Sequence, residues 1–164
     1  SFWVPRLAGK TDLIPGRVNH MWFQTDQPGL YLGQCAEYCG AQHAHMLIRV
    51  YVDPADDFQR WLANERKPAV DDPALADERA TFLSLSCVNC HRVRGTPAKG
   101  TYAPDLTHLM ARETLASGMV PNDLANLDEW VRDPQTIKDD CLMPAFGLSD
   151  TQRDQVVRYL RSLQ

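Results

Sequence analysis

The chain has 164 residues, enough for one large domain or two small ones, and 44% of them are hydrophobic, which is ordinary for a globular protein. A formal net charge of -4 argues against nucleic-acid binding, and no apolar run approaches the ~20 residues that a membrane span requires. The opening segment has no features of a signal peptide, so we expect any export or anchor segment to lie upstream of this sequence.

The first third of the chain has short apolar runs broken by Gly and Pro. These runs predict β-strands at 18–24, 30–34 and 46–52, with a turn at 27–29. The segment between the last two predicted strands is therefore expected to be a loop at the end of a sheet.

A short helix is expected next, with Asp53 as its cap and Pro54 at its first position. Phe58 and Trp61 then lie on one face of this helix. A polar, proline-bracketed stretch at 64–73 follows and predicts a linker.

Helical patterns dominate the rest of the chain. Helices are expected at 75–86, 123–132 and 149–163, the last with a capping box formed by Ser149 and Gln152. A broad apolar stripe on the final helix predicts packing against the first of the three.

The sequence Cys87-Val88-Asn89-Cys90-His91 has the C-x-x-C-H spacing of covalent c-type haem attachment. Cys87 and Cys90 would bond the haem vinyl groups, and His91 would bind the iron as its proximal ligand. Met143, just before the final helix, is the expected sixth ligand. Iron bound axially by His and Met has no open position for oxygen, which favours an electron carrier.

Met110, Met119 and His108 are rivals for the sixth position, and His108 would give a bis-His haem of lower potential. Met143 is preferred because its Met-Pro turn precedes the terminal helix. Cys141 remains as a fifth thiol, either passive and partly buried or able to link two chains.

The predicted loop contains a second group of soft ligands: Cys35, Cys39, His43 and Met46. Copper prefers this combination of thiolate, imidazole and thioether, and two thiolates can bridge two copper ions. A Cys35–Cys39 disulfide and a zinc site are the alternatives, and Met46 argues against zinc. His45 is expected to be a bystander.

The pattern C-x-E-x-C-G-x-x-H-x-x-M in this loop resembles the binuclear CuA centre of cytochrome c oxidase subunit II, which lies on a cupredoxin fold. The resemblance extends to residues 2–5, 15–17 and 58–61. It implies that Cys35 and Cys39 bridge the two copper ions.

The same resemblance implies that His43 and Met46 each complete one copper ion. Glu37 would offer its backbone carbonyl to copper and its carboxylate to a magnesium ion at the junction with the catalytic subunit. The family's first copper histidine falls just before Ser1, so the copper site is expected to be incomplete in this chain, and His20 does not fit the missing position.

Residues 76–164 resemble a class I cytochrome c, and the combination resembles subunit II of the caa-type haem–copper oxidases. The implied fold has two domains. Residues 1–67 would be the C-terminal part of an all-β, Greek-key cupredoxin, 68–75 a linker, and 76–164 an all-α cytochrome c. The resemblance also implies that the Pro104 carbonyl accepts the proton of His91 and that Trp130 binds a haem propionate, with core packing as the alternative for Trp130.

The expected function is therefore that of an electron-relay subunit of a proton-translocating cytochrome c oxidase. Electrons would pass from a donor through haem c to CuA and on to catalytic subunit I, which reduces oxygen. The donor would be a small cytochrome c or a quinol-oxidising complex, attracted by the more acidic second half of the chain. The expected location is the periplasm or outer face of the bacterial cytoplasmic membrane, with membrane attachment only through preceding helices. The alternatives are a nitric oxide or nitrous oxide reductase component and a copper-handling assembly protein.

Overall fold

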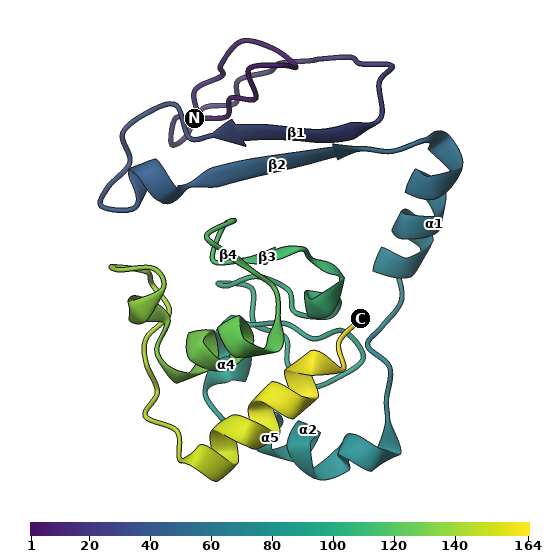
Figure 1. Ribbon diagram of the computed structural model, residues 1–164, viewed down its shortest axis with the longest axis vertical. Helices are drawn as coiled ribbons and strands as arrows, with labels where there is room; N and C mark the ends of the chain where they lie inside the picture. Colours follow the sequence, from purple (N-terminus) through teal and green to yellow (C-terminus); the bar gives the residue numbers. More distant parts are fainter.

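The computed structural model describes residues 1–164 and contains a strand-rich N-terminal part and a helical C-terminal part (Figure 1). No helix in it is both long and apolar enough to cross a membrane. The N-terminal elements are β1 (Gly29–Gln34), η1 (His43–His45), β2 (Leu47–Val52) and α1 (Ala55–Glu65). The C-terminal elements are η2 (Pro73–Leu75), α2 (Ala76–Ser84), α3 (Cys87–Cys90), η3 (Leu109–Ala111), β3 (Thr114–Leu115), β4 (Val120–Pro121), α4 (Leu124–Arg132), η4 (Pro134–Thr136) and α5 (Asp150–Arg161).

Strands β1 and β2 form an antiparallel pair in which Gly29 is opposite Val52 and Gln34 is opposite Leu47. Both strands were predicted and are confirmed. The predicted strand at 18–24 is wrong: this run forms no strand, and Trp22 is 85% exposed. An apolar run becomes a strand only where a neighbouring backbone pairs with it, and this segment has no such partner in the structure.

The first eleven residues cross one end of the β1–β2 pair. The amide of Gln34 donates to the Trp3 carbonyl at 3.1 Å, and Phe2 pairs with Thr11 in an isolated bridge. A Cβ on Gly33 would lie 2.2 Å from the Trp3 carbonyl oxygen, so only glycine permits this close crossing. The crossing buries Val4 completely and thereby covers the end of β1 that leads into the copper-type loop.

Helix α1 forms where it was predicted, but its cap differs. Pro54 is the N-cap residue and no side chain caps the helix, so the prediction for Asp53 is wrong. The rings of Phe58 and Trp61 lie 5.7 Å apart on the helix surface, and both side chains are about half exposed. The helix therefore connects the two parts of the chain without contributing a buried residue.

The C-terminal part has one core of twelve buried side chains, centred on the packing of α2 against α5. The rings of Phe82 and Tyr159 lie 5.2 Å apart across this interface. The capping box of Ser149 and Gln152 starts α5 as predicted. The predicted helix at 75–86 is shorter because Leu85 is extended, which ends α2 and lets α3 start in a new direction.

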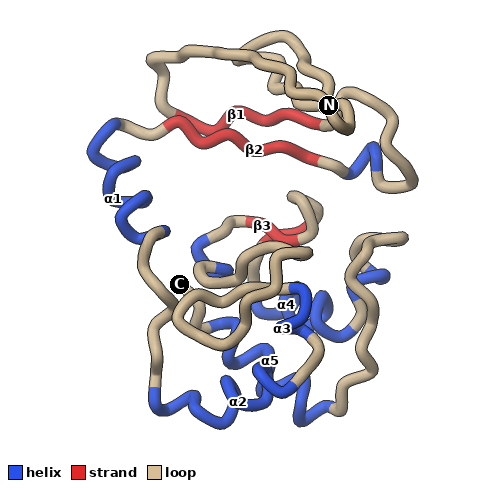
Figure 2. The backbone as a smooth tube through the Cα atoms, turned by 180° about the vertical axis from the view of Figure 1, so that it is seen from behind, coloured by secondary structure: helices blue, strands red, loops and turns tan.

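The tube view in Figure 2 shows the β1–β2 pair on one side of the helical part, with the short β3–β4 hairpin between them. This hairpin was not predicted, because strands of two residues have no detectable alternation.

Candidate metal centres

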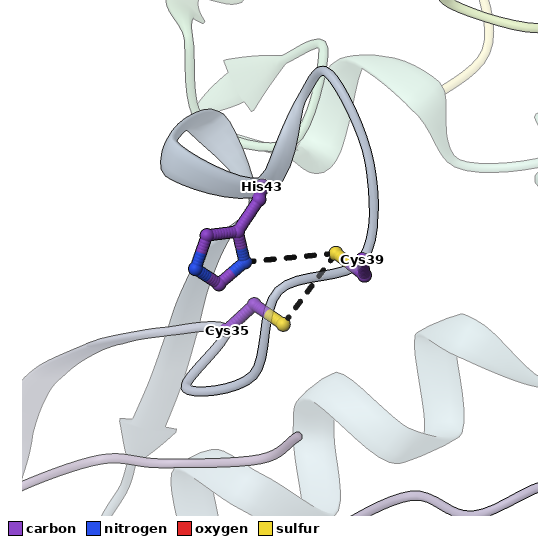
Figure 3. A group of neighbouring side chains, drawn as sticks. All are labelled: Cys35, Cys39 and His43. Carbon is purple, nitrogen blue, oxygen red and sulfur yellow. Dashed lines mark hydrogen bonds between the residues drawn. The ribbon is translucent and has the colours of Figure 1, made fainter.

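The loop between β1 and β2 brings four soft ligand side chains to one point. Its base is closed by the Cys35 amide, which donates to the Met46 carbonyl at 2.9 Å, and η1 turns the chain back between them. The Cys39 sulfur lies 3.7 Å from the Cys35 sulfur and 3.7 Å from His43 Nδ1 (Figure 3). The Met46 sulfur is 3.9 Å from the Cys39 sulfur. Cys39 is therefore the central residue of the cluster.

The cluster fits copper by the chemistry of its donors. One ligand atom each from Cys35, Cys39 and His43 lies within 4.8 Å of the others, and both cysteines are free thiols. Two sulfurs this close can bind the same ion without rearrangement of the loop. The Met46 thioether beside them is a ligand that copper accepts and that hard cations do not.

The two cysteines of the cluster differ in ionisation. Backbone hydrogen bonding at Glu37 lowers the pKa of the Cys35 thiol. Desolvation, followed by the neighbouring Cys35, raises the pKa of Cys39. Cys35 therefore loses its proton more readily than Cys39, and a bound cation would replace the proton of each thiol.

Glu37 presents its two oxygen groups in different directions. Its carbonyl oxygen is 3.2 Å from the Cys35 sulfur, whereas its carboxylate is 63% exposed and 3.5 Å from Lys10 Nζ. His45 Nδ1 lies 3.2 Å from the Gln42 side chain, and His20 is exposed and outside the cluster.

The C-x-x-C-H motif forms α3 and the residue that follows it. Cys87 and Cys90 are the first and last residues of this four-residue helix, and His91 ends it in an extended conformation. Burial raises the pKa of the Cys87 thiol. His91 Nδ1 lies 2.8 Å from the carbonyl oxygen of Pro104, which leaves Nε2 as the ring nitrogen available to a metal.

A close-packed turn supports the motif from behind. A Cβ on Gly100 would lie 2.3 Å from the Cys90 carbonyl carbon, and the Gly100 amide donates to the His91 carbonyl at 3.1 Å. The Ala103 amide donates to the Cys90 carbonyl at 2.9 Å. The backbone around Cys90 is therefore fixed, and the motif's side chains are left for a prosthetic group. These donors and this support fit haem c.

The candidate sixth ligands lie in different environments. Met143 is half-buried in the coil before α5, while Met110 packs against the core. His108 is buried, with Nδ1 2.6 Å from the Gln164 carbonyl and Nε2 3.2 Å from the Lys67 carbonyl. Both of its nitrogens already face backbone oxygens, so His108 is not available to iron. Trp130 is half-buried against the core.

Two family models match the chain in separate regions. The model described as "Cytochrome C oxidase subunit II, periplasmic domain" matches residues 1–52, and the model described as "Cytochrome c" matches residues 75–164. The second match covers more than half of the chain. The chain belongs to the cytochrome c family. Its N-terminal region is a cupredoxin-like, subunit II domain, so the two-domain fold class expected from the sequence is confirmed.

Relatives of this cytochrome c match both regions together. A protein named cytochrome c oxidase subunit 2 from Alkalihalophilus pseudofirmus is 41% identical over 100% of this chain and 48% of its own length. Proteins of the same name from Bacillus sp. strain PS3 and Bacillus subtilis are 36% and 28% identical, each over 100% of this chain and 49% of their own length. The chain thus spans about half the length of the curated relatives it matches. The resemblance to subunit II with a fused cytochrome is confirmed.

The matched families imply haem c in the cytochrome c domain and copper in the subunit II domain. Sequence reasoning missed one residue beside the haem-ligand candidates. Gln135 Nε2 donates to the carbonyls of Cys141 and Met143 at 3.1 and 2.9 Å and thereby fixes the Met143 coil. Asp133 accepts a hydrogen bond from the Gln135 amide at 3.0 Å. The Asp-Pro pair indicates this turn in the sequence, but no periodic pattern indicates what the Gln135 side chain binds.

Proposed function

We propose that the chain is the electron-relay part of a cytochrome c oxidase and carries electrons from a donor protein to the catalytic subunit. When bound, haem c and the copper pair supply reversible one-electron oxidation and reduction. The observation that carries the proposal is the presence of two soft ligand sets in one chain, one around Cys39 and one in α3. Relatives named cytochrome c oxidase subunit 2 combine the same two regions, which supports this assignment.

The proposal assigns a role to each candidate ligand. Cys87 and Cys90 would form the thioether bonds to haem c, and His91 and Met143 would bind its iron. The Pro104 carbonyl, 2.8 Å from His91 Nδ1, would keep the imidazole oriented and leave Nε2 free to bind iron. The Trp130 side chain would either donate a hydrogen bond to a haem propionate or pack in the core, and its half-buried position allows both roles.

At the copper loop, Cys35 and Cys39 would hold two copper ions. His43, Met46 and the Glu37 carbonyl would supply further donors from this chain. The exposed Glu37 carboxylate would bind magnesium at the boundary with catalytic subunit I.

The domain boundaries follow the same assignment: residues 1–67, a linker at 68–75, and residues 76–164. The match to a periplasmic domain supports a location on the outer face of the bacterial cytoplasmic membrane. We infer that the donor is a small cytochrome c or a quinol-oxidising complex, and that the protein is held at the membrane by helices outside residues 1–164.

The first experiment tests the cofactors. After maturation with haem and copper, acid–acetone extraction should leave a reduced-minus-oxidised haem spectrum on the polypeptide. The copper pair should give a purple, mixed-valence spectrum when the full-length subunit is used. Haem that extracts into acetone would contradict covalent attachment. Bound copper that gives no mixed-valence spectrum and accepts no electrons would indicate a copper-handling protein.

The second experiment tests the relay. A photoexcited ruthenium complex reduces the haem of the matured protein, and the absorbance of iron and copper is followed in time. Each electron lost by ferrous iron should be gained by copper, with equal stoichiometry. Iron that stays reduced while copper is unchanged would overturn the relay.

A further inference from the structure

A polar cluster connects the two parts of the chain away from the hydrophobic core. Arg49 and Tyr51 lie on β2, and Glu113 lies just before β3. Glu113 Oε2 accepts from Arg49 Nη2 at 2.6 Å and from the Tyr51 hydroxyl at 2.9 Å. Arg49 Nε also donates to the Tyr51 oxygen at 2.9 Å, so the three side chains form a closed triangle.

A second contact joins the two ligand loops directly. The side-chain amide of Gln42 donates to the backbone carbonyl of Asp139. Gln42 immediately precedes the copper-ligand candidate His43, and Asp139 lies four residues before Met143. In Figure 1 the loop ahead of η1 accordingly lies next to the coil that follows η4.

A third contact lies between these two. Gly118, in the β3–β4 turn, is so close to Leu47 that a Cβ on it would be 3.2 Å from the Leu47 Cβ. The preceding residues Ala116 and Ser117 have φ angles of 55° and 63°, in the left-handed region that non-glycine residues rarely adopt. The hairpin thus holds a strained turn against β2, and strain of this kind persists only where surrounding contacts enforce it.

We propose that the triangle of Arg49, Tyr51 and Glu113, together with the Gln42–Asp139 hydrogen bond, is an interdomain clamp. The clamp holds the cytochrome domain against β2 and keeps the loop that contains His43 in contact with the coil that leads to Met143. The proposal rests on the relay function, because the rate of electron transfer falls steeply with distance. Arg49, Tyr51, Glu113 and Gln42 are positioning residues that touch no metal ligand atom.

The clamp is weak enough to open. The Glu113 side chain is 59% exposed and the Arg49 side chain 27% exposed, and exposed ion pairs contribute little and are screened by salt. The contact between the two parts can therefore open at the expense of polar contacts that water replaces. High salt is expected to favour the open arrangement.

A charge-reversal cycle in the full chain tests the clamp. The variants are Glu113→Arg, Arg49→Glu and the two combined, and the matched control is reversal of the exposed Asp57–Arg60 pair within α1. Residual dipolar couplings and small-angle X-ray scattering report whether the two domains share one orientation. Each single reversal should increase the population of the open arrangement about threefold, which corresponds to the free energy of an exposed ion pair. The double reversal should restore the population of the closed arrangement.

Electron exchange between iron and copper, measured in the same variants, should slow with the single reversals and recover in the double. Metal spectra should stay unchanged in all of them. Single reversals that leave the open population at its wild-type value would overturn the clamp, and intact electron exchange in those variants would leave the relay standing. Lack of electron exchange in a wild-type chain with ordered domains would instead overturn the relay and leave the clamp standing.

Discussion

The two parts of the chain hold their ligands in physically different ways. All twelve side chains of the hydrophobic core lie between Phe82 and Leu163, around the helices next to the haem motif. Residues 1–52 bury only three hydrophobic side chains, and one of these is Cys35 itself. A two-stranded sheet is marginally stable by itself. The haem-ligand set is thus supported by its own core, whereas the copper-ligand set depends on backbone crossings and on neighbouring surfaces.

The largest expected effect separates the two metal sites. Cys39→Ser should abolish copper binding, because the Cys39 sulfur lies within 3.9 Å of a ligand atom of each of three other residues. Haem content should not change, since α3 has its own support. Elemental analysis and the haem spectrum measure the two outcomes. Cys141→Ser is the matched control, and a Cys39→Ser protein with full copper content would contradict the assignment.

Because only the helical part has a hydrophobic core, substitutions in the two parts should differ in their effect on stability. Phe82→Ala should lower the free energy of unfolding of the helical part by about 3–5 kcal/mol, the usual cost of removing a buried aromatic ring. Leu32→Ala on β1, where the side chain is 59% exposed, should change stability by less than about 0.5 kcal/mol. Urea denaturation followed by circular dichroism measures both. Equal losses would show that the two parts share one core.

One glycine in each part of the chain lies too close to neighbouring backbone atoms to accept a side chain. Gly33→Ala and Gly100→Ala each place a Cβ within 2.3 Å of backbone atoms that cannot move aside. We expect losses of about 1–3 kcal/mol or more from such overpacking. Gly33→Ala should reduce copper affinity and Gly100→Ala the yield of attached haem. Gly9→Ala, with no atom within 4 Å of its Cβ, is the control for both.

Helix capping gives a smaller effect. Ser149→Ala removes the hydroxyl that accepts the Gln152 amide at 3.2 Å and should cost about 1 kcal/mol. Thermal unfolding measures the loss. Ser149→Asp keeps an acceptor at this position and should retain most of the stability. Helix α1 has no side-chain cap to lose, so Asp53→Ala should have little effect there.

The smallest effect concerns pH. Hydrogen bonds from the Tyr51 hydroxyl and Arg49 lower the pKa of Glu113 below its ordinary value near 4.5. A lowered carboxyl pKa means that the interdomain contribution is complete above the ordinary value and is lost as pH falls through the lowered one. Domain orientation should therefore be constant from pH 7 to about 4.5 and loosen below it. Glu113→Gln should remove this dependence, and a transition at neutral pH would contradict it.

Local patterns predicted the elements that local physics forms. The short apolar runs at 30–34 and 46–52 predicted β1 and β2, and the Ser149–Gln152 spacing predicted the start of α5. The same reasoning failed at 18–24, because strand formation needs a partner that the run itself does not encode. It also failed for Asp53, because a residue able to cap a helix need not occupy the N-cap position.

Residue types and their spacing along the chain are enough to show which chemistry is available: thiol, imidazole and thioether groups and the C-x-x-C-H motif. Which of these groups lie in contact is visible only in the folded protein. In the fold, both nitrogens of His108 face backbone carbonyls, and Gln42 pairs with Asp139 across 97 residues. Such contacts depend on how distant segments pack, and no local period in a sequence records that.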